Sequence, residues 1–163
     1  MTKLRALAVA LLMMSVIQSH HVGAQDRAMI VGTWKVISEE IQFQDNGERL
    51  APLGAHPRGY LIFTPQGRMM FYVEAEGRKA PTTDEQRLAA YLTLNAYTGT
   101  YRVEGNKWIT RVDGAWNVEW VGTEQERTFD LKGHKLSVTT PWIPNPLRGG
   151  RLFRGYVTFE RED

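Results

Sequence analysis

The segment GTYRVEGNKWITRVDGA, residues 99–115, has a Gly105-Asn106 pair between two stretches in which polar and apolar residues alternate. A two-residue turn of this kind between alternating stretches predicts a β-hairpin. The turn fixes three cross-strand pairs, which are Glu104–Lys107, Val103–Trp108 and Tyr101–Thr110. Because such partners share a face of the sheet, one mostly apolar face is predicted to point inward: Tyr101, Val103, Trp108, Thr110 and Val112. The other face is charged, apart from Ile109, and is predicted to contact water.

The same strand pattern continues along most of the chain. Alternating segments bounded by turn residues predict strands over 33–43, 59–64, 68–74, 99–104, 107–115, 124–131, 135–140 and 155–161. The segment 84–95 differs, because its apolar residues recur at helical spacing and Thr83 and Gln86 have the spacing of a capping box. Eight antiparallel strands of this length can close into a barrel that holds side chains or one small ligand. We therefore predict an all-β, eight-stranded antiparallel barrel with one inserted amphipathic helix, and a β-sandwich is the alternative.

The first 24 residues have the pattern of a secretory signal peptide. Lys3 and Arg5 supply the basic start, and residues 4–17 form the apolar run. Val22 and Ala24 are the small residues before the cleavage site. The run of about 14 residues is shorter than the roughly 20 that a membrane-spanning helix needs. We expect cleavage near Ala24-Gln25, a single domain over 25–163, and a periplasmic or secreted protein without stable membrane insertion.

Removal of residues 1–24 takes away two basic residues and no acidic one, which leaves 18 of each. This zero net charge argues against a nucleic-acid partner. The chain has no Cys, which excludes a disulfide framework and thiolate catalysis. After cleavage His56 and His134 remain, and neither stands at the spacing of metal ligands. We therefore expect no metal and no cofactor, and we assign no catalytic residue.

Arg127 is predicted to be a cation on the inner face of its strand. Alternation puts it on the same side as Phe129 and Leu131, and puts Glu124 and Glu126 outside. A buried guanidinium must be paired or must meet a ligand anion. Arg127 is thus a candidate for contact with an acid group of a ligand.

Other candidate residues come from the first strand and from the aromatic side chains. Alternation puts Trp34, Val36, Ser38 and Glu40 on one face, with Glu40 close to water at the strand end. Structural roles are assigned to Gly32, Trp34 and Arg161, with Trp34 closing one end of the barrel against Arg161. The candidate ligand-binding residues are Tyr101, Trp108, Thr110, Arg127, Trp116, Trp120 and Ser38.

Four segments in order resemble the lipocalin-like domain family of short bacterial and fungal proteins: GTW at 32–34, PRGYLIFTP at 57–65, YTGTY at 97–101 and WVGTEQ at 120–125. The resemblance covers about residues 30–160. It implies a calycin-type barrel with a helix inserted after the third strand, and no single established activity. Many relatives carry His at the position of Thr110, and its absence here weakens any acid–base mechanism carried over from the family.

Three functions remain open from the sequence. We favour an exported protein that binds a small apolar or aromatic molecule in the barrel, with Arg127 meeting an acid group. The second is a cofactor-independent isomerase or cyclase of a small biosynthetic intermediate, with Tyr101, Thr110 and Arg127 as its polar residues. The third is a protein-binding module or inhibitor with a filled barrel. A cavity lined by Tyr101, Trp108 and Arg127 would favour the first two, and a core filled by them the third.

Overall fold

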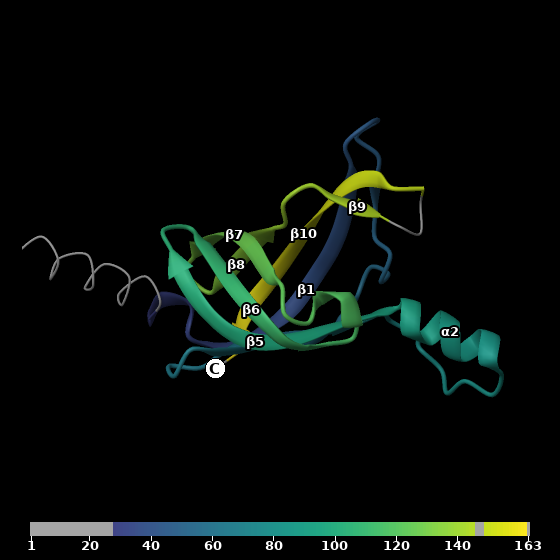
Figure 1. Cartoon of the computed structure of the whole chain (residues 1–163), viewed down its shortest axis with the longest axis horizontal. Coiled ribbons are helices and arrows are strands. Elements are labelled where there is room, and N and C mark those ends of the chain that lie inside the picture. Colours follow the sequence, from purple (N-terminus) through teal and green to yellow (C-terminus); the bar gives the residue numbers. More distant parts are fainter. Residues whose placement is uncertain (1–27, 146–148, 163) are drawn as a thin grey trace, which may run out of the picture.

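The computed structural model describes residues 28–145 and 149–162, so the predicted signal peptide and its cleavage site lie outside the described residues. The chain forms mainly strands (Figure 1). These are β1 (Gly32–Phe43), β2 (Arg49–Leu50), β3 (Arg58–Phe63), β4 (Arg68–Glu74), β5 (Leu94–Glu104), β6 (Lys107–Ala115), β7 (Glu124–Lys132), β8 (Lys135–Thr139), β9 (Ile143–Asn145) and β10 (Arg151–Glu162). A helix, α2 (Asp84–Leu92), stands between β4 and β5, and a 3-10 turn, η1 (Val118–Trp120), stands between β6 and β7.

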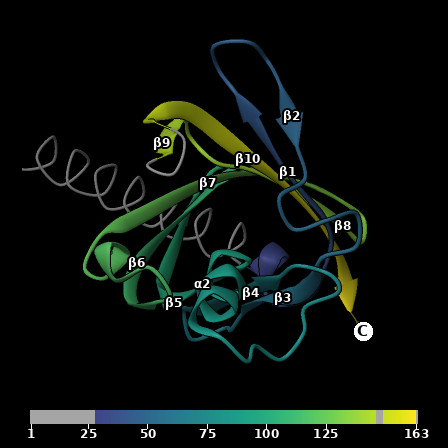
Figure 2. The ribbon, with the colours of Figure 1, turned by 90° about the vertical axis from the view of Figure 1, so that its right-hand side faces the viewer.

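Eight of the strands close into an antiparallel barrel. They are hydrogen-bonded in the order β1, β3, β4, β5, β6, β7, β8 and β10, and β10 pairs back to β1. Figure 2 looks onto the end from which α2 projects, and there the strands form a ring. The short β2 and β9 lengthen the sheet beyond the barrel on β1 and β10. The predicted barrel is confirmed, and the sandwich alternative is excluded.

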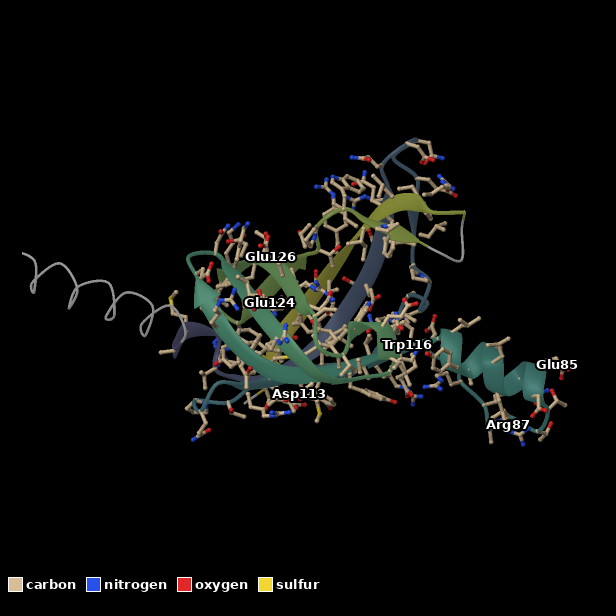
Figure 3. All side chains as sticks on the ribbon, viewed as in Figure 1. Glu85, Arg87, Asp113, Trp116, Glu124 and Glu126 are labelled. Carbon is tan, nitrogen blue, oxygen red and sulfur yellow. The ribbon has the colours of Figure 1, made fainter. Side chains whose placement is uncertain are left out.

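The register of the β5–β6 hairpin is the one that the turn predicts. Glu104 pairs with Lys107, Val103 with Trp108, and Tyr101 with Thr110. The predicted inner face is in the core, where Trp108, Thr110 and Val112 are buried. The charged face is outside, and on β7 Glu124 and Glu126 also point away from the core, toward Arg102 and Lys107 (Figure 3).

One end of the barrel is closed by Trp34 and the chain that precedes it. The indole Nε1 of Trp34 donates a hydrogen bond to the carbonyl oxygen of Ile30 at 2.8 Å. The guanidinium of Arg161 lies 4.2 Å from the centre of the Trp34 ring and donates to the carbonyl oxygen of Val31 at 2.9 Å. Gly32 passes so close that an added Cβ would lie 2.6 Å from Nη1 of Arg161. We call this the closed end.

Aromatic rings fill the barrel next to the closed end. Phe63 meets Tyr101 and Trp108 edge-on, with ring centres 4.8 and 5.2 Å apart. The hydroxyl of Tyr101 donates to the carbonyl oxygen of Thr64 at 3.1 Å. Tyr101 and Trp108 are 6% and 1% exposed, so this half of the barrel is a packed core.

Helix α2 extends away from the opposite end of the barrel (Figure 1) and has no buried residue. As predicted, the Thr83 side chain caps it by accepting from the backbone nitrogen of Gln86. The helix ends at Leu92, earlier than the predicted 95, because Asn95 already pairs with Val73 in the sheet. Within the described residues, no helix combines the length and the apolar character needed to cross a membrane.

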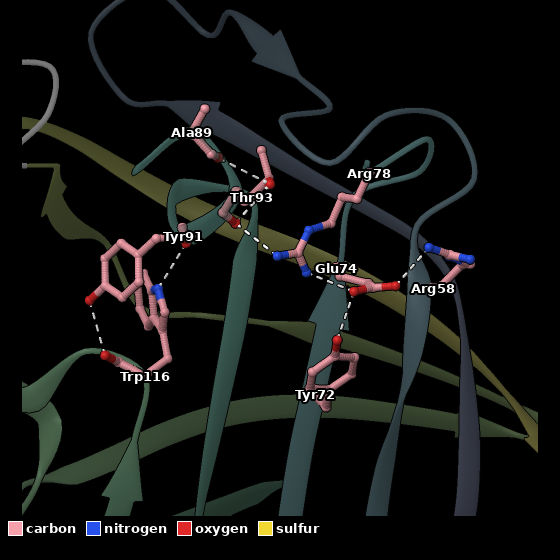
Figure 4. Close-up of polar contacts among 9 residues, drawn as sticks. Arg58, Tyr72, Glu74, Arg78, Ala89, Tyr91, Thr93 and Trp116 are labelled. Atoms are coloured by element: carbon pink, nitrogen blue, oxygen red, sulfur yellow. Dashed lines mark hydrogen bonds and ion pairs between the residues drawn. The ribbon is translucent and has the colours of Figure 1, made fainter. Parts of the chain in front are cut away.

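Contacts at the base of α2 hold it to the barrel rim (Figure 4). The Tyr91 hydroxyl donates to the carbonyl oxygen of Trp116 at 3.0 Å, and Nε1 of Trp116 donates to the carbonyl oxygen of Tyr91 at 3.1 Å. On the other side, Arg78 donates to the carbonyl oxygen of Ala90 in α2 at 3.1 Å and forms an ion pair with Glu74, which also accepts from Tyr72. The hydrogen bond from Tyr72, followed by that from Arg78, holds the pKa of Glu74 below its usual value.

Candidate functional site at the open end of the barrel

The end of the barrel where β4 finishes and β5 begins lies opposite Trp34, and we call it the open end. Several residues that line or cap its inside are only half-buried there: Glu39, Asn95, Trp120 and Val157. Tyr97, Val73 and Phe71 are buried just below them. The side chains at the open end are therefore less completely buried than the residues around Trp34.

A bulge in β1 puts Glu39 inside the barrel. The pairing of β1 with β10 shifts between Val36, which faces Phe159, and Ser38, which faces Thr158. An extra residue at a bulge moves the following side chains to the other face of the strand. Glu39 faces Val157 in this register, on the inner side.

The predicted common face of the first strand therefore ends at the bulge. Trp34 and Val36 point inward as predicted, but Ser38 and Glu40 point outward. Glu40 forms an ion pair with Arg49 at 3.1 Å, on the outer face. Ser38 lines a groove of about 310 Å³ on the outside of β1, β8 and β10, and not the interior.

The carboxyl group of Glu39 has one oxygen sealed from solvent. Its Oε2 atom accepts no hydrogen bond. Burial raises the pKa of Glu39 to about 7, and the positive charge of Arg127 partly opposes this shift. Glu39 is the residue that alternation alone could not find, because the bulge that turns it inward has no glycine or proline to mark it.

Arg127 lies inside the barrel, as predicted, and is 8% exposed. Its Nη1 donates to the carbonyl oxygen of Glu126 at 2.7 Å, and Nη2 donates to Oε1 of Gln125 at 3.4 Å. The guanidinium carbon lies 5.8 Å from the centre of the Tyr97 ring. Among the described residues, no carboxylate forms an ion pair with Arg127, so its charge is available to a ligand.

Aromatic rings form one wall of the site and connect it with the surface. Tyr97 lies 5.5 Å from Phe71 and 5.6 Å from Trp120, measured between ring centres. Trp120 meets Trp116 at 5.5 Å, and Trp116 packs on Tyr91 of α2 at 5.7 Å. Trp120 thus lies at the mouth, while Trp116 also lines an apolar groove of about 310 Å³ on the outer face of β4, β5 and β6.

Further polar atoms on the inner face lack hydrogen-bond partners. They are Oδ1 of Asn95, Nε1 of Trp108 and Oγ1 of Thr110, all buried. Asn95 lies two residues before Tyr97 on the same face of β5, close to the mouth. The sequence reading missed it because the helical pattern was extended to 95.

The candidate residues from the sequence thus fall into three groups. Arg127 and Trp120 lie at the open end, together with Glu39 and Asn95. Tyr101, Trp108 and Thr110 belong to the packed interior. Ser38 and Trp116 face the outer grooves.

Metal-binding groups do not gather in the described part of the chain. His56 and His134 are both exposed, on separate loops. No group of three His, Cys, Asp or Glu side chains stands close enough to hold a metal ion in residues 28–145 and 149–162. The groups that the structure does bring to the open end are the Glu39 carboxyl, the Arg127 guanidinium, the Asn95 amide and aromatic rings.

Comparison with known proteins agrees with this architecture. Residues 31–162 match the lipocalin-like domain. The comparison with curated proteins gave no match. Because the family match runs through every strand of the barrel, from β1 to β10, the chain belongs to the lipocalin-like domain family.

Proposed function

We propose that this protein is an exported binding protein that holds a small, largely aromatic or apolar molecule at the open end of its barrel. The observation that carries this proposal is the set of buried polar groups without partners on the inner face, above all Oε2 of Glu39 and Oδ1 of Asn95. Each such atom costs about 1–3 kcal/mol if nothing binds it. A ligand that satisfies these atoms would recover that free energy.

The side chains at the open end indicate which chemical groups the ligand carries. Tyr97 and Trp120 offer ring faces and edges for a flat molecule. Arg127 donates hydrogen bonds, so it suits a carbonyl or carboxylate oxygen. Glu39 and Asn95 each present an oxygen, which suits a hydroxyl or N–H group. A ring system with an acceptor at one position and a donor at another fits this set.

Export is the second part of the proposal, and the pattern of residues 1–24 supports it. The full-length gene product, made in a bacterial host, is expected in the periplasm with Gln25 as its first residue. Intact-mass and N-terminal analysis of the periplasmic fraction measure this. A full-length chain that stays with the cytoplasm or the membrane would contradict export without affecting the binding proposal.

The binding proposal is tested with 2-naphthoic acid, an aromatic acid, by quenching of indole fluorescence. We expect one saturable site that weakens at least about tenfold in the Arg127→Met variant, because an acid group loses its cation. Arg111→Met is the matched control, because Arg111 lies on the outer face of β6. Native mass spectrometry of protein purified without organic solvent then identifies any natural ligand. No saturable quenching, or equal binding by both variants, would refute this site.

The alternative, a protein-binding role, requires a barrel filled with side chains, and only the half next to the closed end clearly has such a packed core. Around Tyr101 and Trp108 the barrel is solid, as that alternative requires. The open end differs, because a solid core seldom keeps a carboxyl oxygen without a hydrogen bond and a guanidinium without an ion pair.

A further inference from the structure

We propose that Glu39 is a general base and acid, which, with Arg127, moves a proton between carbons of a ketone bound in the barrel. The substrate class is a small aromatic or apolar ketone with an acidic C–H next to its carbonyl group. The reaction exchanges this proton and, where the ketone has a C=C bond at the β,γ-position, moves that double bond into conjugation with the carbonyl group. This inference rests on the proposed function, because the same site must first bind the molecule.

The first support is that the Glu39 carboxyl is unengaged. Many other acids of the described chain are held in ion pairs, such as Glu40 with Arg49 and Glu124 with Arg102. Oε2 of Glu39 accepts no hydrogen bond from any protein group, yet it lies inside the barrel and not in solvent. This oxygen therefore has no protein donor, and a molecule that enters the barrel beside it would supply its first partner.

The second support is the placement of Arg127. Its charge acts on Glu39, but no hydrogen bond or ion pair joins the two side chains in the described structure. A substrate oxygen can therefore take the guanidinium while the carboxyl meets the neighbouring carbon. The bonds to Glu126 and Gln125 hold the guanidinium in place before the reaction. Fixed donors of this kind stabilise an oxyanion without reorganisation.

The third support is the acidity of Glu39. A group that first takes a proton and then returns it works best when its pKa lies near the working pH. Burial of Glu39 raises its pKa to about 7, so both the carboxylate and the carboxylic acid are populated near neutral pH.

The reaction balances without a cofactor or an external reagent. The Glu39 carboxylate removes a proton from the carbon next to the carbonyl, and an O–H bond forms as the C–H bond breaks. The electron pair of that bond becomes a C=C bond, and the carbonyl π pair moves to oxygen as an enolate, which Arg127 stabilises. The carboxylic acid then returns a proton to a carbon of the enolate or its conjugated γ-position, and the C=O bond re-forms.

The test uses 2-tetralone, a ketone fused to a benzene ring, in D₂O at neutral pH. Loss of its C1 proton signal in the NMR spectrum reports enolisation. We expect the purified protein to accelerate this loss at least about 100-fold over buffer, within the usual range of general acid–base catalysis. In the Glu39→Gln variant the rate is expected to fall close to that of buffer. Glu40→Gln is the matched control, because the neighbouring carboxyl faces outward, and it is expected to keep the wild-type rate.

Binding of 2-tetralone, measured by indole fluorescence in the same samples, separates the possible outcomes. If Glu39→Gln binds normally but no longer exchanges the proton, the variant is folded and the inference is supported. If the wild-type protein binds 2-tetralone without exchange, or if Glu39→Gln exchanges it as fast as wild type, the inference is overturned and the proposed function stands. If neither 2-tetralone nor 2-naphthoic acid binds, both fail.

Discussion

The guanidinium of Arg161, near the end of the last strand, lies 4.2 Å above the Trp34 ring at the start of the first barrel strand. The same guanidinium donates to the carbonyl oxygens of Met29 and Val31 at 2.8 and 2.9 Å. One side chain thus joins the two ends of the barrel sequence and the segment that covers Trp34. These contacts make the closed end a unit of stability, away from the open end where we place binding.

Replacement of Arg161 by Leu is expected to destabilise the protein by about 2–3 kcal/mol. The change removes a partly buried cation–π contact and leaves two backbone carbonyls without their donor. Urea denaturation measures the loss in free energy of unfolding. Arg68→Leu is the control, because its exposed ion pair with Asp113 is worth less than about 1 kcal/mol. Equal losses in the two variants would show that Arg161 is only a surface charge.

Replacement of Gly59 by Ala is expected to cost more than about 2 kcal/mol or to prevent folding. Gly59 has a φ of 150°, and an added Cβ would lie 2.0 Å from the carbonyl oxygen of Tyr72 on the neighbouring strand. The clash is with backbone, which cannot turn aside as a side chain can. Soluble yield and the urea midpoint measure the effect.

The matched control for this change is Gly105→Asn. Gly105 has a φ of 60°, and nothing lies within 4 Å of an added Cβ. Asn tolerates that conformation, so we expect a loss below about 1 kcal/mol. A Gly59 variant as stable as this control would mean that β3 and β4 can move apart.

The barrel and its hairpin register were predictable because they depend on local rules. The Gly105-Asn106 turn fixes which residues of β5 and β6 face each other, and alternation then assigns the two faces. Alternation along β7 likewise predicted that Arg127 points into the barrel. Periodicity carries this information as long as a strand is regular.

The candidate site was only partly predictable, because its polar residues stand where the regular pattern breaks. Glu39 follows a bulge, and its orientation depends on the pairing of β1 with β10, about 120 residues apart in the sequence. Asn95 looked like the end of a helix until its pairing with Val73 placed it in β5. Such long-range pairing cannot be obtained from local spacing. The sequence therefore predicted that Arg127 points inward, but it did not predict that Glu39 does.

Loss of the indole N–H at Trp116 is expected to loosen helix α2 without weakening the barrel. In Trp116→Phe the bond to the carbonyl oxygen of Tyr91 disappears, while an aromatic ring stays in place. Because α2 buries no residue, few other contacts hold it. We expect faster amide hydrogen exchange over 84–92 and an unchanged urea midpoint for the barrel strands.

Val118→Ala is the control for this experiment, because Val118 is 78% exposed in the neighbouring turn η1. Its exchange pattern is expected to match the wild type. If exchange over 84–92 stays slow in Trp116→Phe, the helix is held by its other contacts, such as the hydrogen bond from Arg78 to the carbonyl oxygen of Ala90.

The stability of the protein is expected to fall as the pH rises through the range in which Glu39 titrates. The pKa of Glu39 is raised from 4.5 to about 7 in the folded state, so between these values the folded chain holds a proton that the unfolded chain has lost. Stability from this group is complete below pH 4.5 and is lost as the pH approaches and passes 7. Arg127 is the charged group whose field acts on Glu39 inside the barrel.

Glu39→Gln removes this titration, and the resulting difference from wild type should depend on pH. At pH 8 the variant is expected to be more stable than the wild-type protein by up to roughly 3 kcal/mol, since each pKa unit corresponds to about 1.4 kcal/mol. At pH 4 the two should differ little, because the wild-type side chain is then neutral in both states. Urea denaturation at the two pH values measures the difference, and Glu40→Gln is the control because the Glu40 carboxyl lies on the outer face beside Arg49. A variant that is equally stabilised at pH 4 and pH 8 would mean that Glu39 is not the buried carboxyl of this site, and would remove the acid on which the proposed proton transfer depends.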